Sequence, residues 1–148
     1  MGVRVEFRRN ESLTQPRVIV EAAEETSEVR RLMALIEAGE PVLLNGWGDA
    51  GIERIPEADV VRIYGERQRV YAETTEGRFL LRERLYELEA RLDSRLFVRI
   101  SNSEIVNSRH ILRLDASLTG TICLHMRGGA KAYASRRYVP GLRKHFGL

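Results

Sequence analysis

Hydrophobic and polar residues alternate along much of the second half of the chain, and this pattern predicts short β-strands. The segments that show it are residues 60–66, 69–75, 78–82, 96–100, 104–107, 110–115, 121–126 and 130–135. Hairpin turns are expected at Glu76-Gly77, Thr119-Gly120 and Gly128-Gly129. One helix is expected at residues 83–93, where Leu85, Leu88 and Leu92 share a face. The pattern is typical of a mainly-β domain of short antiparallel sheets with one helix.

The first fifty residues have a different pattern and predict a small α+β extension. Val3, Val5 and Phe7 alternate with charged residues, which predicts a strand, and residues 17–22 predict a second one. A helix should follow, with Thr26 or Ser27 as its N-terminal cap, and it should end at Gly39 before Pro41. Its apolar face consists of Val29, Leu32, Met33 and Ile36. Residues 41–45 predict a third strand, and residues 46–51 a loop. We therefore expect a strand-strand-helix-strand unit at residues 1–52 and a second domain at residues 56–148.

The chain has a formal net charge of +3, and the charge is distributed unevenly. Residues 1–56 hold 7 basic and 10 acidic residues, and residues 57–98 hold 8 and 9. Residues 99–148 hold 9 basic residues against 2 acidic ones. Such a basic final third indicates a polyanionic partner, although basic residues can also simply solvate a surface.

Several classes of protein are excluded or disfavoured. The one cysteine, Cys123, allows neither an internal disulfide nor a cysteine-based zinc site. No apolar run is long enough to cross a bilayer, and the first ten residues lack the apolar core of a secretory signal, so we expect a cytoplasmic protein. His125 has no second histidine at ligand spacing, and the glycines at 128–129 lack the helix and Lys-Ser/Thr pair of a phosphate loop. We expect no metal and no cofactor.

Ser, His and Asp occur close together in SRHILRLDAS, residues 108–117. A nucleophile needs a base within hydrogen-bond reach and a third group that orients the base. Neighbouring positions on a strand alternate between faces and do not provide this geometry. We therefore expect that the protein is not an enzyme.

Two basic clusters and one polar stretch are better candidates for a functional site. The clusters are GERQR, with Arg67, Gln68 and Arg69, and SRRY, with Arg136 and Arg137. Between them lies RISNSEIVN, residues 99–107, which is unusually polar for a β region. Arg can read guanine, and Asn or Gln can read adenine, through paired hydrogen bonds. Asn also caps turns; this interpretation is favoured for Asn107, and both remain open for Asn102.

FVRISNSEIVNSRHILRLD, residues 97–115, followed by a β-hairpin and by SRRY, closely resembles the LytTR DNA-binding domain. The resemblance covers roughly residues 56–147, including the strand pair at 60–73 and the helix at 83–92. It implies a DNA-binding transcription regulator whose loops enter successive major grooves, often at paired direct repeats upstream of promoters. The DNA-contacting positions that it implies are Arg67 and Gln68, Ser101 and Asn102, and Arg136 and Arg137. Arg69 lies beside the first pair, and Arg143 and Lys144 lie in the basic tail, where phosphate contacts are expected.

The chain departs from the resembling family at several places. Relatives often carry a different polar residue at Gln68 and an aromatic one at Glu104, and we expect the Glu104 carboxylate to face away from DNA. The roughly 55 N-terminal residues are too few for a phosphoacceptor receiver domain, so we expect no control by phosphorylation. This indicates the short, receiver-less branch of the family, often encoded beside a small membrane protein.

Two further expectations concern partners. The extension is too small to bury much surface alone, so either it promotes a homodimer or it packs on the β domain of its own chain. An RNA-binding module and a protein-interaction module remain the alternatives to a DNA-binding regulator.

Overall fold

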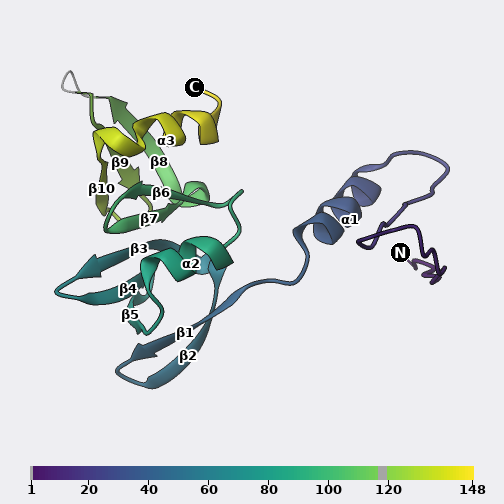
Figure 1. Ribbon diagram of the computed structural model, residues 1–148, viewed down its shortest axis with the longest axis horizontal. Coiled ribbons are helices and arrows are strands. Elements are labelled where there is room, and N and C mark those ends of the chain that lie inside the picture. Colours follow the sequence, from purple (N-terminus) through teal and green to yellow (C-terminus); the bar gives the residue numbers. More distant parts are fainter. Residues whose placement is uncertain (1, 117–119) are drawn as a thin grey trace. The chain divides into compact units, whose positions relative to one another are not determined.

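The computed structural model describes residues 2–116 and 120–148, and the chain divides into two compact units, Met1–Glu40 and Pro41–Leu148 (Figure 1). The expected turn at Thr119-Gly120 lies partly outside the described residues. No helix within these residues is both long and apolar enough to span a bilayer.

The first unit contains one helix, α1 (Ser27–Ala38), which the sequence predicted. The hydroxyl of Thr26 accepts a hydrogen bond from the backbone N–H of Val29 (3.3 Å), and Gly39, with φ of 69°, ends the helix. The strands expected at residues 3–7 and 17–22 are wrong, because the structure has no strand there. No described residue of this unit is buried. Alternating residues form a strand only when a neighbouring strand and a core cover one face, and this unit supplies neither.

The second unit contains a seven-stranded antiparallel sheet with the order β2-β1-β5-β4-β3-β7-β6. Its strands are β1 (Leu43–Gly48), β2 (Gly51–Pro56), β3 (Val60–Glu66), β4 (Arg69–Thr74), β5 (Gly77–Leu81), β6 (Phe97–Ser101) and β7 (Glu104–Asn107). A three-stranded antiparallel sheet has the order β10-β9-β8. Its strands are β8 (Ile111–Ala116), β9 (Ile122–Met126) and β10 (Lys131–Ala134). The predicted strands of the C-terminal domain are therefore present, within one or two residues.

The hairpin of β1 and β2 belongs to the large sheet and not to the N-terminal extension. Trp47 of β1 pairs with Leu80 of β5, and Leu44 and Ile55 are buried in the core. The predicted loop at residues 46–51 is reduced to a turn at Asp49 and Ala50. The structure therefore divides the chain after Glu40, whereas the sequence pattern suggested a boundary between residues 52 and 56. The pattern of this short segment could not reveal the pairing with β5, which lies thirty residues later.

The second unit has two helices where the sequence predicted one. Helix α2 (Leu85–Arg91) lies where it was expected. Helix α3 (Val139–Phe146) occupies the segment that was interpreted as a basic tail. Val139, Leu142 and Phe146 recur at helical spacing, and they pack into the core that lies under the small sheet. A 3-10 turn, η3 (Arg136–Tyr138), leads directly into α3.

Each sheet has its own hydrophobic core. The first core packs α2 against one face of the large sheet and includes Ile63, Ala72, Leu88, Phe97 and Ile105. The second core joins α3, the small sheet and strands β6 and β7, and includes Ile100, Val106, Leu124, Met126 and Leu142. Figure 1 shows α2 beside the large sheet and α3 beside the small one. Strands β6 and β7 contribute to both cores, so the turn that joins them is held rigidly.

Candidate nucleic-acid interface

The turn between β3 and β4 presents Arg67 and Gln68 to solvent. Glu66 pairs with Arg69, so the loop has two residues, and both have positive φ, 51° for Arg67 and 64° for Gln68. Two left-handed residues define the type I′ hairpin turn, which favours Asn-Gly because other side chains are strained there. Non-glycine residues held in this region often mark functional sites.

The turn between β6 and β7 presents Asn102 and Ser103. The guanidinium of Arg99 donates to the backbone carbonyl oxygens of Ser101 (2.7 Å) and Asn102 (2.6 Å). Glu89 of α2 accepts a third bond from Arg99 at 2.6 Å. The Ser101 hydroxyl oxygen accepts from the backbone N–H of Ser103 at 3.2 Å. The turn backbone is therefore held by charge-assisted hydrogen bonds as well as by the strand pairing.

The η3 turn presents Arg136 and Arg137. The backbone N–H of Ser135 donates to the carbonyl of Ile100 at 2.9 Å, which attaches the start of η3 to β6. The guanidinium of Arg137 lies 5.6 Å from the centre of the Tyr138 ring, within the range of a cation–π contact. Both arginines are exposed.

The fold brings these three turns together. The backbone N–H of Gly65 donates to the carbonyl of Ser103 at 2.8 Å, so the β3–β4 turn adjoins the β6–β7 turn. The Tyr138 hydroxyl donates to Oδ1 of Asn102 at 2.8 Å, so η3 also adjoins the β6–β7 turn. We call this set the three-loop surface. It contains Arg67, Gln68, Ser101, Asn102, Arg136 and Arg137, and Arg69 follows it at the start of β4.

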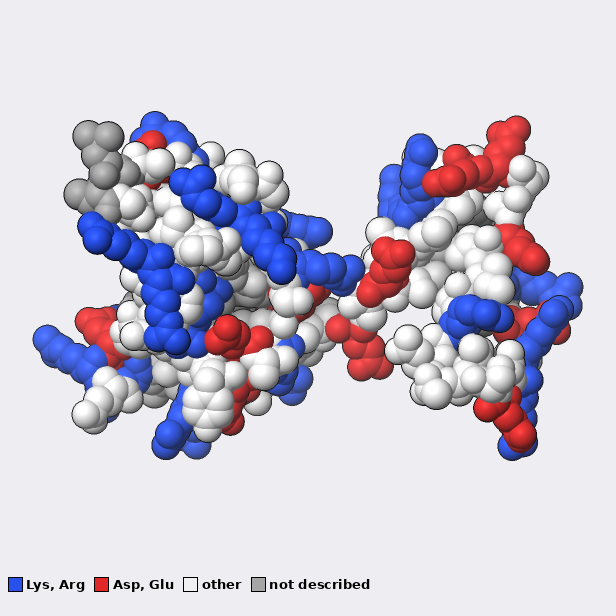
Figure 2. All heavy atoms as spheres, turned by 45° about the horizontal axis from the view of Figure 1, so that its top comes forward, with Lys and Arg blue, Asp and Glu red and all other residues white. Residues whose placement is uncertain are grey.

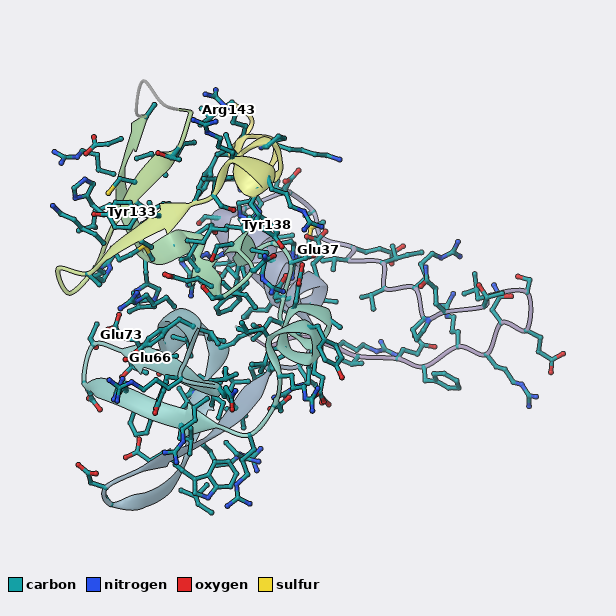
Figure 3. All side chains as sticks on the ribbon, turned by 60° about the vertical axis from the view of Figure 1, so that its left-hand side comes forward. Glu37, Glu66, Glu73, Tyr133, Tyr138 and Arg143 are labelled. Carbon is teal, nitrogen blue, oxygen red and sulfur yellow. The ribbon has the colours of Figure 1, made fainter. Side chains whose placement is uncertain are left out.

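Arg143 and Lys144 are exposed on α3. Lys144 lines the same groove of about 770 Å³ as Arg137 and Tyr138. Arg143 points away from Tyr138, as Figure 3 shows. The structure thus brings Lys144 next to the three-loop surface, and Arg143 lies on a different side of the helix.

The cations of the three-loop surface and of α3 differ in their pairing from several arginines elsewhere in the sheet unit. Arg62, Arg78, Arg91 and Arg99 each form an ion pair with a glutamate. Within residues 2–116 and 120–148, no ion pair involves Arg67, Arg69, Arg136, Arg137, Arg143 or Lys144. Figure 2 shows Lys and Arg side chains over the upper and middle part of the larger unit, with most of its visible Asp and Glu in the lower part, among further Lys and Arg. These cations are therefore available to phosphates.

Asn107 has the structural role that the sequence favoured. Its side chain is 1% exposed, donates to the carbonyl of Val60 (2.9 Å) and accepts from the backbone N–H of Arg109 (3.1 Å).

Ser108 donates its hydroxyl to the carbonyl of Leu96, and the His110 ring bonds to the carbonyl of Ala58. These two side chains are thus occupied by backbone groups and do not assemble with Asp115.

His125 lies on the half-exposed face of β9, and its Nε2 is 2.6 Å from the Asp115 carboxylate. The hydrogen bond from His125 is the main cause that lowers the pKa of Asp115. Within the described part of the chain, no cluster of His, Cys, Asp and Glu could hold a metal ion.

Glu104 lies on the sheet face that also carries Arg62. Its carboxylate is 3.4 Å from the Arg62 guanidinium, which is also bonded to Glu73 at 2.7 Å. Burial raises the pKa of Glu104, and the charge of Arg62 opposes the rise. The carboxylate is thus engaged within the sheet.

A family model described as the LytTr DNA-binding domain matches residues 50–147 of the chain. The chain belongs to the LytTR DNA-binding domain family. The solved LytTr DNA-binding domain of a Bacillus cereus protein has a similar fold, with a TM-score of 0.70 and 24% identity, covering 74% of this chain and 100% of that one. Curated relatives include an uncharacterised HTH-type transcriptional regulator of Staphylococcus aureus (strain NCTC 8325 / PS 47), 35% identical over 105 residues, or 71% of each chain. The corresponding regulator of strain MRSA252 is 34% identical over the same length.

Tyr138 adjoins the three-loop surface, although the sequence did not single it out. Tyr138 contacts both Asn102 and Arg137, and its only signal in the sequence was its place in the SRRY motif.

Proposed function

We propose that this LytTR protein regulates transcription by binding specific sites in double-stranded DNA through the three-loop surface. The observation that supports this most directly is the meeting of three exposed turns, rich in Arg, Asn and Gln, through the Gly65–Ser103 and Tyr138–Asn102 hydrogen bonds. Turns on a rigid sheet can present such side chains to base edges in a groove. The names of the Staphylococcus relatives support a role in transcription.

The roles that we propose follow from position and side-chain chemistry. Asn102 and Arg137 read base edges, with Gln68 and Arg67 entering a neighbouring groove. Arg69, Arg136, Arg143 and Lys144 neutralise phosphates, because they are exposed and have no carboxylate partner among the described residues. Ser101 and Ser103 complete the polar rim of the central turn.

Further parts of the proposal rest on the family resemblance. They are binding to paired direct repeats upstream of promoters, regulation without catalysis, and a functional link to a small membrane protein encoded nearby. A chromosomal target implies a cytoplasmic location. Homodimer formation through the first unit is a separate expectation.

The test begins with a footprint of the protein on the DNA upstream of its own gene, which yields a duplex for titration. Equal affinity for that duplex, for its single strands and for RNA of the same sequence would contradict the proposal. Asn102→Ala and Arg137→Ala should each reduce the preference for the site over unrelated duplex by about 1–3 kcal/mol. Lys144→Ala should weaken binding to all duplexes alike and reduce the salt slope by about one unit. All titrations need one fixed salt concentration.

A further inference from the structure

Tyr138 makes two contacts that link the central turn to the arginine turn. Its hydroxyl donates to Oδ1 of Asn102 at 2.8 Å, and its ring lies 5.6 Å from the guanidinium carbon of Arg137. The ring is half-buried, whereas Asn102 and Arg137 are exposed. The tyrosine therefore lies beneath two side chains that are free to reach a ligand.

We propose that Tyr138 is a positioning residue that sets base specificity, because its hydroxyl orients the Asn102 carboxamide and its ring supports the Arg137 guanidinium. This inference rests on the proposed function, since it assigns Tyr138 a role through two residues that read DNA.

The orientation of a carboxamide determines which base it can recognise. Adenine recognition needs the oxygen to accept from N6 and the nitrogen to donate to N7. An exposed asparagine can rotate by half a turn about its terminal bond and exchange its oxygen and nitrogen. In the structure the tyrosine hydroxyl donates to Oδ1 and occupies one of its two acceptor positions, and in this arrangement Nδ2 is the end of the amide that is left to donate. The second acceptor position on Oδ1 and both N–H groups remain available to a base.

A second set of contacts already holds the turn backbone. Arg99, anchored by Glu89, donates to the carbonyl oxygens of Ser101 and Asn102. The torsions of the Asn102 side chain are then the main freedom left in the turn. The Tyr138 hydroxyl is the group that restricts them.

The ring has a separate effect on Arg137. A guanidinium that lies over an aromatic face is attracted to it and loses part of its rotational freedom before it binds. Because Tyr138 follows Arg137 directly in η3, loss of the ring would release the arginine without altering the sheet. The two contacts therefore predict two effects that different substitutions can separate.

The experiment measures affinity for the footprinted duplex and for duplexes with single base-pair changes. Tyr138→Phe keeps the ring and removes the hydroxyl. It should reduce discrimination at the base pair that Asn102 reads by about two- to tenfold, the worth of one hydrogen bond, and leave the Arg137 base pair unchanged. Tyr138→Leu removes both contacts and should reduce discrimination at both base pairs. Tyr133→Phe is the matched control, because Tyr133 is 63% exposed on β10 and should change neither.

A double-mutant cycle identifies the route of the effect. In an Asn102→Ala protein, Tyr138→Phe should cause no further loss of discrimination, because the carboxamide that accepts from the hydroxyl is gone. Additive losses, or a Tyr138→Phe protein that discriminates like the parent, would overturn the inference while leaving the proposed function intact. A Tyr138→Phe protein with a lower melting temperature and equal weakening on every duplex would show a structural role and also overturn it. The proposed function itself fails if Asn102→Ala and Arg137→Ala both leave discrimination unchanged.

Discussion

Asn102 and Asn107 carry the same side chain in one hairpin, and their surroundings give them different properties. Asn107 is buried, and its amide donates to one strand and accepts from the next turn. Asn102 is exposed, and its side chain accepts a hydrogen bond from the Tyr138 hydroxyl. At the scale of the residue, burial separates a structural asparagine from one that can contact DNA.

Asn107→Ala should therefore act on stability and not on recognition. The substitution leaves the Val60 carbonyl and the Arg109 N–H without their partner, so the free energy of unfolding should fall by about 1–3 kcal/mol. Urea denaturation measures this, and titrations below the unfolding transition should give an unchanged preference for the specific site. Asn102→Ala is the matched variant; it should reduce the preference for the specific site and leave the free energy of unfolding unchanged. The assignment of the two roles is wrong if Asn107→Ala reduces the preference and Asn102→Ala reduces the stability.

Glu104 gives a prediction about pH. Its pKa in the folded protein is raised above the ordinary value of 4.5, chiefly by burial. Between these two values the folded state binds more protons than the unfolded state, so this carboxyl contributes a free energy of unfolding that falls as pH increases. A glutamine at this position does not titrate. The free energy of unfolding of Glu104→Gln, relative to that of the parent, should therefore rise as pH increases from 4.5 to the raised pKa and remain constant above it.

Urea titrations of both proteins from just below pH 4.5 to neutrality measure the difference. Glu76→Gln, at an exposed turn, is the control and should follow the parent closely. A difference between Glu104→Gln and the parent that stays flat, or that falls with pH, would contradict the assignment.

At the scale of the element, the β3–β4 turn combines a strained conformation with an exposed place in the proposed interface. Arg67 and Gln68 both adopt left-handed backbone angles, which cost side chains roughly 1–2 kcal/mol per residue. Asn-Gly fits the same turn with less strain. The presence of Arg-Gln here is consistent with a side-chain function that outweighs the loss of stability.

Replacing Arg67-Gln68 by Asn-Gly should raise the free energy of unfolding by roughly 1–2 kcal/mol and weaken DNA binding. Thermal melting and duplex titration measure the two effects. Gln68→Gly alone relieves part of the strain and keeps the Arg67 cation, so it should gain stability with a smaller loss of affinity. An Asn-Gly protein that binds DNA as tightly as the parent would remove this turn from the proposed interface.

At the scale of the whole molecule, the two units differ in the hydrophobic residues that each buries. Pro41–Leu148 has two hydrophobic cores, whereas the described part of Met1–Glu40 has no buried residue. Exposed apolar side chains on α1 include Met33, Leu35 and Ile36. A helix of twelve residues with no partner is marginal in water, so its apolar face favours association with another surface.

We expect the full chain to self-associate and a chain that begins at Pro41 to be a folded monomer that still binds DNA. Analytical ultracentrifugation and melting curves test both statements. A chain that begins at Ile55 is the informative control, because it lacks β1 and the buried Leu44, and it should be less stable than the Pro41 chain. Identical monomeric behaviour of the full chain and the Pro41 chain would reject self-association through the first unit.

The sequence alone determined the features that depend on neighbouring residues. Strands β3 to β10 and helices α1 and α2 follow from periodicity and turn chemistry within a few positions, whereas the structure selected Thr26 over Ser27 as the cap of α1. The motif residues of the LytTR family, the basic final third and the structural character of Asn107 were also visible there.

The tertiary structure decided the features that depend on residues far apart in the chain. It assigned the β1–β2 hairpin to the large sheet, left residues 3–7 without a strand partner and folded the basic tail into α3. It also selected which arginines are paired within the protein, and it placed the Tyr138 hydroxyl on Asn102, thirty-six positions away. The physical reason is that strand pairing, burial and side-chain contacts are long-range interactions, and a local pattern is compatible with several of them until the whole core is assembled.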